Sequence, residues 1–394
     1  MLPESLFTQI KRAGDFIRAG SLVVFPTETV YGLGADAFNA EAVSRIYSAK
    51  GRPGDNPLIL HVASREDFSR LAHEPPDYAH ALIEKFWPGP LTLVVRKKAD
   101  LPAWLGGHPN GVTETIGIRM PAHPVASALI RAADCIIAAP SANKAGKPSP
   151  TSLAHVLEDF CEAERGGIFF LEGENADVGL ESTVVDVTGE MPVILRPGGV
   201  TAEEIFEVAS ILQNSVGECH SPTQFETPPR SPGMKYKHYA PRAEMTVLSG
   251  EPQKIATHIF EAGLESGAEK IGALISAETQ AHLPHPTPPN VKILPLGVGA
   301  GSDPIDDILT NRNFFQKSSE VSVREQPPAR NESELLSFHE YKKIIAQNFF
   351  ANLREFDKLN VNIIFAEAVC ENGIGAAIMD RMRKAADGRI IDLS

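Results

Sequence analysis

Two cations, several hydroxyl groups and two glycines lie close together near the start of the chain. Residues 25–34 read Phe-Pro-Thr-Glu-Thr-Val-Tyr-Gly-Leu-Gly, and residues 50–61 read Lys-Gly-Arg-Pro-Gly-Asp-Asn-Pro-Leu-Ile-Leu-His. Arginine suits bidentate recognition of carboxylate or phosphate, and lysine acts as a point charge. Each signal alone has a plainer explanation, since glycines after a strand often only form a turn and a Lys-x-Arg often only compensates a helix dipole. Their order and density together indicate a site for an anionic ligand.

The elements around this stretch predict an open α/β sheet. A strand over residues 22–25 is expected to break at Pro26 into a turn that contains Gly32 and Gly34. Apolar residues at 3- and 4-residue spacing then predict a helix that Pro53 stops, because proline cannot continue a helix. A second strand over residues 58–62 carries His61. Ligands of open α/β sheets bind at strand ends, so this order predicts a site there.

The chain alternates in the same way as far as residue 212. Periodicity predicts helices over 6–18, 66–71, 78–86, 125–132, 152–160 and 202–212, and strands over 91–96, 115–119, 135–139, 168–171, 183–187 and 193–195. The apolar strand over 135–139 suits a sheet that is covered on both faces. Trp87 is expected in the core. Ser141 and Asn143 follow a strand, where they fit either ligand binding or simple turn chemistry.

A polar, proline-bearing segment from residue 213 predicts a linker to a second α/β unit. That unit is expected to contain strands over 246–248, 271–275, 291–296 and 361–366, a long helix over 341–359 and a terminal helix over 376–386. Residues 316–334 are polar and charged and predict an exposed loop.

Bulk properties exclude several classes of protein. The 394 residues suggest two or three domains, and the formal net charge of −13 argues against a protein that coats nucleic acid. The 4 cysteines include no Cys-x-x-Cys pair, which argues against zinc and against a disulfide framework. Charged residues interrupt the N-terminus, and no run of about 18 apolar residues exists, so we expect a cytoplasmic protein without a membrane partner.

Several blocks of the sequence resemble, in the same order, those of the Sua5/YrdC/YwlC family of threonylcarbamoyl-AMP synthases. They begin at Pro26, Lys50, Asn56, Phe86, Arg119, Ala139, Gly179 and Leu195. The block Ser231–Pro241 resembles one that marks the long, two-domain Sua5 form, and residues 349–386 resemble its C-terminal domain. The resemblance implies a YrdC-like open twisted α/β domain over 1–212, a linker or lid over 213–244, and a smaller Rossmann-like α/β domain over 245–394.

The same resemblance implies an L-threonylcarbamoyladenylate synthase, which is a nucleotidyltransferase. Such an enzyme carboxylates the amine of L-threonine with bicarbonate, and the carbamate then attacks the α-phosphorus of ATP and releases pyrophosphate. The product serves the t6A modification of tRNA. The implied partners are therefore ATP, L-threonine, bicarbonate and the downstream tRNA threonylcarbamoyl transferase machinery, with a weak contact to tRNA as a further expectation.

The family's site residues carry over by position. Lys50 and Arg52 would be the catalytic cations that hold bicarbonate and phosphates. The threonine and bicarbonate part would be lined by Thr29, Tyr31, His61, Arg119 and Ser182. Contacts to ATP would come from Arg52, Asn56, Thr115, Ser141, Asn143, Ser149, Arg196 and Tyr236, of which Tyr236 would close over the pocket from the linker. Mg²⁺ would accompany ATP on its phosphates, with no metal ligand assigned to the protein.

Three other functions stay open at this point. A non-catalytic RNA-binding module is disfavoured by the net charge of −13 and by the lack of interleaved aromatic and basic residues. A hydrolase built on Ser141 and His61 lacks the Gly-x-Ser-x-Gly elbow. A carbamoyl transferase would be identified by a strict dependence on carbamoyl phosphate.

Overall fold

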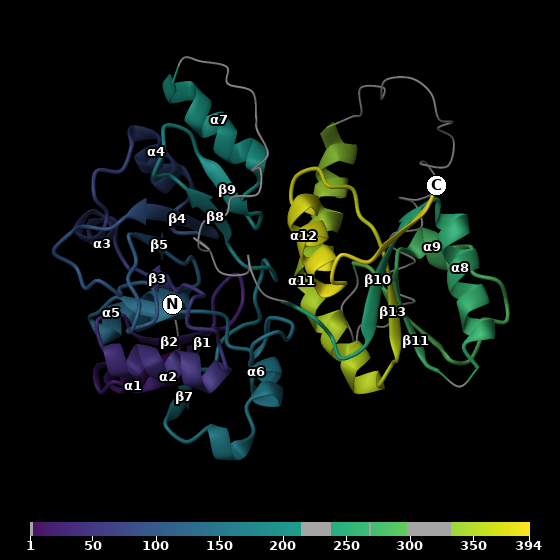
Figure 1. Cartoon of the computed structure of the whole chain (residues 1–394), viewed down its shortest axis with the longest axis horizontal. Coiled ribbons are helices and arrows are strands. Elements are labelled where there is room, and N and C mark those ends of the chain that lie inside the picture. Colours follow the sequence, from purple (N-terminus) through teal and green to yellow (C-terminus); the bar gives the residue numbers. More distant parts are fainter. Residues whose placement is uncertain (1–2, 214–237, 268, 298–331) are drawn as a thin grey trace. The chain divides into compact units, whose positions relative to one another are not determined.

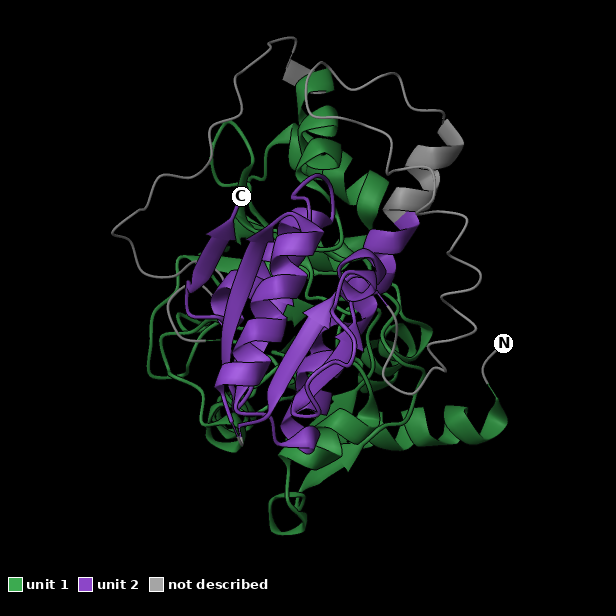
Figure 2. Cartoon of the chain, turned by 90° about the vertical axis from the view of Figure 1, so that its right-hand side faces the viewer, with its two compact units in different colours: residues 1–238 green, residues 239–394 purple. Residues whose placement is uncertain are grey.

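A computed structural model describes residues 3–213, 238–267, 269–297 and 332–394. They form two compact units, residues 1–238 and 239–394 (Figure 2). The domain boundaries drawn from the sequence at 212 and 245 stay predictions, because most of the linker lies outside the described residues. Tyr236 and most of the loop predicted over 316–334 also lie outside them.

The first unit contains a mixed nine-stranded sheet of order β7-β1-β2-β6-β3-β5-β4-β8-β9 (Figure 1). Its strands are β1 (Leu22–Phe25), β2 (Gly32–Asp36), β3 (Ile59–His61), β4 (Leu91–Arg96), β5 (Thr115–Arg119), β6 (Ile137–Ala139), β7 (Ile168–Phe170), β8 (Thr183–Asp186) and β9 (Val193–Arg196). Its α-helices are α1 (Glu4–Arg18), α2 (Ala40–Lys50), α3 (Arg65–Leu71), α4 (Asp77–Phe86), α5 (Pro124–Ala133), α6 (Leu153–Asp159) and α7 (Ala202–Gln213), and a short 3-10 helix spans Glu162–Glu164. The predicted elements agree with these bounds to within a few residues, and β2 is the exception.

The two faces of this sheet are covered differently. On one face, Leu33, Leu60 and Ile118 belong to a core shared with α2, α3, α4 and α7, and Trp87 is buried in that core as predicted. On the opposite face, Phe25 packs with α1 and α5. Across β3, β5, β4 and β8, that second face borders a cavity instead. The sheet therefore leaves part of one face available for a ligand.

The strand β2 corrects the expectation that Gly32 and Gly34 belong to a turn. β1 and β2 pair antiparallel, with Val24 opposite Leu33. The ring of Phe25 lies against both glycines: a Cβ on Gly34 would come within 2.7 Å of Phe25 Cε1 and of Ile137 Cγ2. These glycines are therefore required by the close approach of an aromatic ring to a strand, and not by a turn.

The end of α2 also differs from the prediction. Gly51 adopts a left-handed conformation with φ 62° and ends the helix two residues before Pro53. A proline was therefore not needed to stop the helix. At the other end, the side chain of Asn39 caps the helix by accepting a hydrogen bond from the amide of Ala42.

The second unit is built on a parallel five-stranded sheet of order β12-β11-β13-β10-β14. Its strands are β10 (Glu244–Gly250), β11 (Ile271–Ile275), β12 (Val291–Pro295), β13 (Ile363–Glu367) and β14 (Ile390–Leu393), and its helices are α8 (Pro252–Glu265), α9 (Ala277–Ala281), α11 (Glu332–Leu359) and α12 (Gly375–Ala385). This arrangement confirms the predicted α/β class. The helix predicted over 376–386 is confirmed as α12, but it is not the last element, because β14 follows it and pairs with β10. No helix in the described part of the chain is long and apolar enough to cross a membrane.

Candidate active site

One row of residues crosses five adjacent strands on the partly uncovered face. The strand register places His61 opposite Arg119, Arg119 opposite Thr92, Thr92 opposite Val184, and Val184 opposite Arg196. Residues that oppose each other in paired strands project from the same face of the sheet. Three of the predicted site residues, His61, Arg119 and Arg196, are therefore brought onto one surface from distant parts of the sequence.

Arg119 is the central cation of this row, and its side chain is only 4% exposed. Its Nε donates to the carbonyl of Gly89 at 3.2 Å, and its Nη1 donates to Thr29 Oγ1 at 2.8 Å. Its Nη2 lies 2.7 Å from Glu28 Oε1 in a buried ion pair. Burial opposes ionisation of Glu28, but the nearby charge of Arg119 outweighs it and holds the pKa of that carboxyl below its usual range.

Ser182 and Arg196 form a second polar group at the end of the row. Arg196 donates from Nε and Nη2 to the carbonyl of Ser182 at 3.1 and 2.9 Å, and from Nη2 to its hydroxyl at 3.2 Å. The hydroxyls of Ser182 and Thr92 are 2.8 Å apart. Ser149 donates to the neighbouring Glu181 at 2.5 Å, which ties the loop after β6 to this group.

His61 is a neutral member of the row. It is 4% exposed, and its Nδ1 lies 3.1 Å from the carbonyl of Ile59. A carbonyl only accepts, so this contact places a proton on Nδ1. Burial, and then the nearby charge of Arg119, lower the pKa of His61 to about 3. The imidazole is therefore uncharged at neutral pH and adds no further positive charge to the site.

Lys50 is buried, although it is the last residue of a helix, where a lysine is usually solvated. It is 3% exposed, and its ammonium group donates to the backbone carbonyls of Ser141 and Asn143. Burial, and then the charge of Arg52, lower the pKa of Lys50 well below its usual range. Removal of this side chain should therefore cost stability as well as charge.

Arg52 and Asn56 contact each other within the loop that follows α2. Arg52 donates from Nε to the carbonyl of Asn56 at 3.1 Å, and from Nη2 to Asn56 Oδ1 at 2.8 Å and to the carbonyl of Pro57 at 2.7 Å. The hydroxyl of Tyr47 donates to the same Asn56 carbonyl at 3.1 Å. These contacts hold the loop in one conformation, with the half-buried side chain of Arg52 bound to Asn56 and Pro57.

In the turn after β6, side chains form hydrogen bonds within the turn itself. Ser141 donates to Asn143 Oδ1 at 2.5 Å, and Asn143 Nδ2 donates to the carbonyls of Lys144 and Lys147 at 2.8 and 2.9 Å. Tyr31 is fully buried, and its hydroxyl donates to the carbonyl of Gly173 at 2.8 Å. The structure thus gives these three residues a structural task, and their contact with a ligand stays a prediction.

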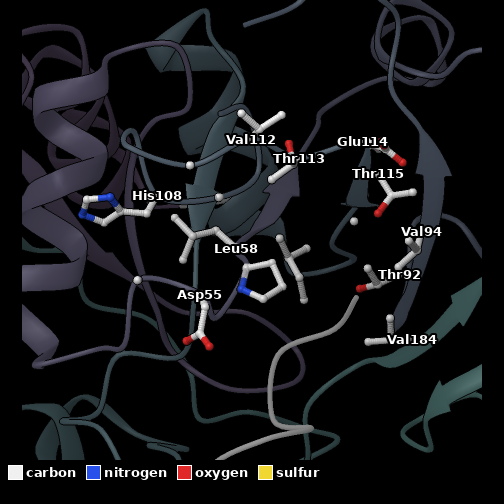
Figure 3. Close-up of a pocket in the computed structure, with 16 residues that line it drawn as sticks. Asp55, Leu58, Thr92, Val94, His108, Val112, Thr113, Glu114, Thr115 and Val184 are labelled. Atoms are coloured by element: carbon white, nitrogen blue, oxygen red, sulfur yellow. The ribbon is translucent and has the colours of Figure 1, made fainter. Parts of the chain in front are cut away.

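A cavity of about 650 Å³ adjoins the polar row on the same face of the sheet. Figure 3 shows Thr92, Thr115 and Val184 on its strand side, and Asp55 and Leu58 across from them. Of the predicted nucleotide contacts, Thr115 lines this cavity directly. The cavity could hold a mostly apolar group beside the buried cations.

Sequence reasoning missed three residues of this site. Glu28 pairs with Arg119, Thr92 contacts Ser182, and Glu181 accepts a hydrogen bond from Ser149. A signal existed for Glu28, because it is the one charged residue in the polar turn between β1 and β2. A carboxylate in such a turn needs a partner if it is buried.

The fold defines a two-unit α/β protein that carries two buried cations, Arg119 and Arg196, on one face of its larger sheet. Residues 15–198 match the Sua5/YciO/YrdC domain family, which is described as telomere recombination, and residues 200–387 match the C-terminal domain of threonylcarbamoyl-AMP synthase. The threonylcarbamoyl-AMP synthase of Pyrococcus abyssi is 40% identical over 97% of this chain and 95% of its own length. That of Bacillus subtilis is 37% identical over 97% of this chain and 94% of its own length.

A solved structure agrees with these matches. The crystal structure of P. abyssi Sua5 complexed with L-threonine superposes with a TM-score of 0.74 at 38% identity, and the alignment covers 97% of this chain and 95% of that one. The chain therefore belongs to the Sua5 family of threonylcarbamoyl-AMP synthases, in its long, two-domain form.

We predict that His61 does not titrate between pH 8 and 5. Its folded pKa of about 3 lies below the unfolded value of about 6.5, so between these values the unfolded chain binds a proton that the folded chain does not, and the fold loses stability as the pH drops from 6.5 towards 3. The loss should be about 1.4 kcal/mol per pH unit within that window. The NMR signal of the His61 ring, assigned with a His61→Gln variant, should be constant from pH 8 to 5. A titration midpoint near 6.5 would contradict the prediction.

Proposed function

We propose that this chain is an L-threonylcarbamoyladenylate synthase, which makes threonylcarbamoyl-AMP and pyrophosphate from L-threonine, bicarbonate and ATP. The observation that carries the proposal is a set of buried cations, two of which, Arg119 and Arg196, stand in the row beside an uncovered cavity. Lys50, Arg119 and Arg196 are 3%, 3% and 4% exposed. Several anionic groups must share this enzyme's site, so cations must offset their repulsion. Relatives that are 37 and 40% identical over nearly the whole chain are named for this activity.

In this proposal the anionic groups of the reactants lie at the cations, and the uncharged adenosine lies apart from them. The carboxylate of threonine and bicarbonate lie against Arg119, beside the neutral His61. The phosphates lie at Lys50 and Arg52, and the adenosine occupies the cavity next to Thr115. When the reactants are bound in this order, the carbamate that forms on the threonine amine lies next to the α-phosphorus of ATP. The fixed cations then stabilise the charge that develops there. The contacts of Asn56, Ser149 and Arg196 with the nucleotide belong to the same proposal.

Magnesium would enter with ATP. Among the described residues, no three His, Cys, Asp or Glu side chains come together as a metal site. Mg²⁺ would take its ligands from phosphate oxygens and water, and there it would neutralise phosphate charge. The protein residues supply the remaining cations, Lys50 and Arg52.

The other candidate functions have less support. The names of the full-length relatives favour catalysis over an RNA-binding module. Against a hydrolase, the hydroxyl of Ser141 donates to Asn143 at 2.5 Å and not to a histidine base. The transfer of the product to tRNA threonylcarbamoyl transferase machinery, a weak contact with tRNA and a cytoplasmic location stay predictions.

We predict that pyrophosphate release from ATP depends on both L-threonine and bicarbonate. The measurement is a coupled pyrophosphate assay with Mg²⁺, run with each substrate left out in turn and with carbamoyl phosphate in place of bicarbonate. Loss of the signal on either omission supports the synthase. Pyrophosphate release that is unchanged without threonine would contradict the proposal. A strict need for carbamoyl phosphate would favour a carbamoyl transferase.

We further predict that Arg52→Ala and Lys50→Met each lower kcat/KM by 10²-fold or more, because a charge contact to the transition state is worth about 3 kcal/mol or more. Lys50→Met should also lower the unfolding temperature, since it leaves two buried carbonyls without a donor. Lys85→Ala is the matched control, because Lys85 pairs at 2.9 Å with Glu207 on the surface and lies in no part of the site. Near-normal turnover of both site variants would show that the phosphates lie elsewhere.

A further inference from the structure

We infer that Glu28 is a positioning residue that holds the guanidinium of Arg119 in the orientation that receives the carboxylate of L-threonine. This inference rests on the proposed function and assigns a role to a residue outside the implied set of ligand contacts. Glu28 stands in the connection between β1 and β2, whereas Arg119 ends β5. The ion pair at 2.7 Å therefore joins two separate segments of the sheet.

The hydrogen bonds of Arg119 leave room for a ligand. A guanidinium carries five N–H groups. Nε is directed to Gly89 and Nη1 to Thr29, while Nη2 lies 2.7 Å from Glu28 without an aligned hydrogen bond. Both terminal nitrogens thus keep N–H groups for an incoming oxyanion. A planar, bidentate contact needs the guanidinium to be fixed in one plane, and its partners on three sides fix that plane.

The hydroxyl groups beside this pair have a fixed direction. Thr27 Oγ1 donates to the carbonyl of Val30 at 2.7 Å, which uses its single proton. Thr29 Oγ1, 2.8 Å away, therefore donates to Thr27 and accepts from Arg119 Nη1. Arg119 can only donate, so Thr29 Oγ1 holds Nη1 through its lone pairs. The polar turn thus holds Arg119 through one acceptor, Thr29, and one carboxylate, Glu28.

Fold stability alone does not explain a carboxylate at this position. The side chains of Glu28 and Arg119 are 8% and 4% exposed, so both lose most of their hydration. Buried ion pairs are often no more stabilising than apolar residues of the same size, and in some proteins they serve to fix a defined arrangement. Here the defined arrangement is the orientation of a cation on the ligand-binding face.

The test is a double-mutant cycle on L-threonine binding, measured by calorimetry with a non-hydrolysable ATP analogue and Mg²⁺ present. The variants are Glu28→Gln, Arg119→Met and the double variant, which removes both charges and so avoids an unpaired buried ion. We expect each single variant to weaken threonine binding 10-fold or more. The double variant should bind no more than twofold worse than Arg119→Met, because Glu28 acts only through Arg119. Affinity for the ATP analogue, measured alone, should stay within twofold for Glu28→Gln.

Each other outcome counts against the inference. If the double variant lost threonine affinity by the product of the two single-variant factors, Glu28 would act independently of Arg119. A lowered unfolding temperature with unchanged threonine affinity in Glu28→Gln would reduce the pair to a structural role. Tighter threonine binding would show that Glu28 competes with the ligand. Glu207→Gln, which removes a surface ion pair, is the matched control. Failure of the wild-type chain to bind threonine would contradict the proposed function itself, and so separates the two claims.

Discussion

The site depends on cations that are buried in the protein. Desolvating a charge is costly unless hydrogen bonds replace the water. For Lys50, these hydrogen bonds come from two backbone carbonyls, which solvate an ammonium group without cancelling its charge. Arg196 contacts the carbonyl of Ser182 in a similar way. The lowered pKa of Lys50 reflects its burial and then the nearby charge of Arg52, and the charge of a bound anion would offset both effects.

The sheet makes this arrangement possible because one of its faces is only partly covered. The register fixes His61, Arg119 and Arg196 in one row, and the neighbouring positions Gly117 and Thr115 open into the cavity. Charged and apolar parts of one ligand can then bind side by side on a rigid surface. Arg119 is oriented by a carboxylate, that of Glu28, together with the hydroxyl of Thr29 and the carbonyl of Gly89.

The sequence predicted the elements better than it predicted the environment of the side chains. The bounds of β5 were correct because Ile116 and Ile118 alternate with smaller or polar residues, which is a local signal. The strand around Gly32 was missed because those glycines are explained by the ring of Phe25, which packs on them across the sheet. The burial of Lys50 depends on carbonyls about 90 residues away, so no local pattern reports it. The family resemblance implied which residues belong to the site, but it did not give their hydrogen-bond or ion-pair partners.

The most direct measurement is a crystal structure of the chain with L-threonine and a non-hydrolysable ATP analogue. The account predicts that the threonine carboxylate lies within hydrogen-bonding distance of Arg119, and that the adenosine fills the cavity against Gly117 and Thr115. It also predicts phosphate oxygens near Lys50. Nucleotide density on the second unit, or an empty cavity with threonine away from Arg119, would contradict it.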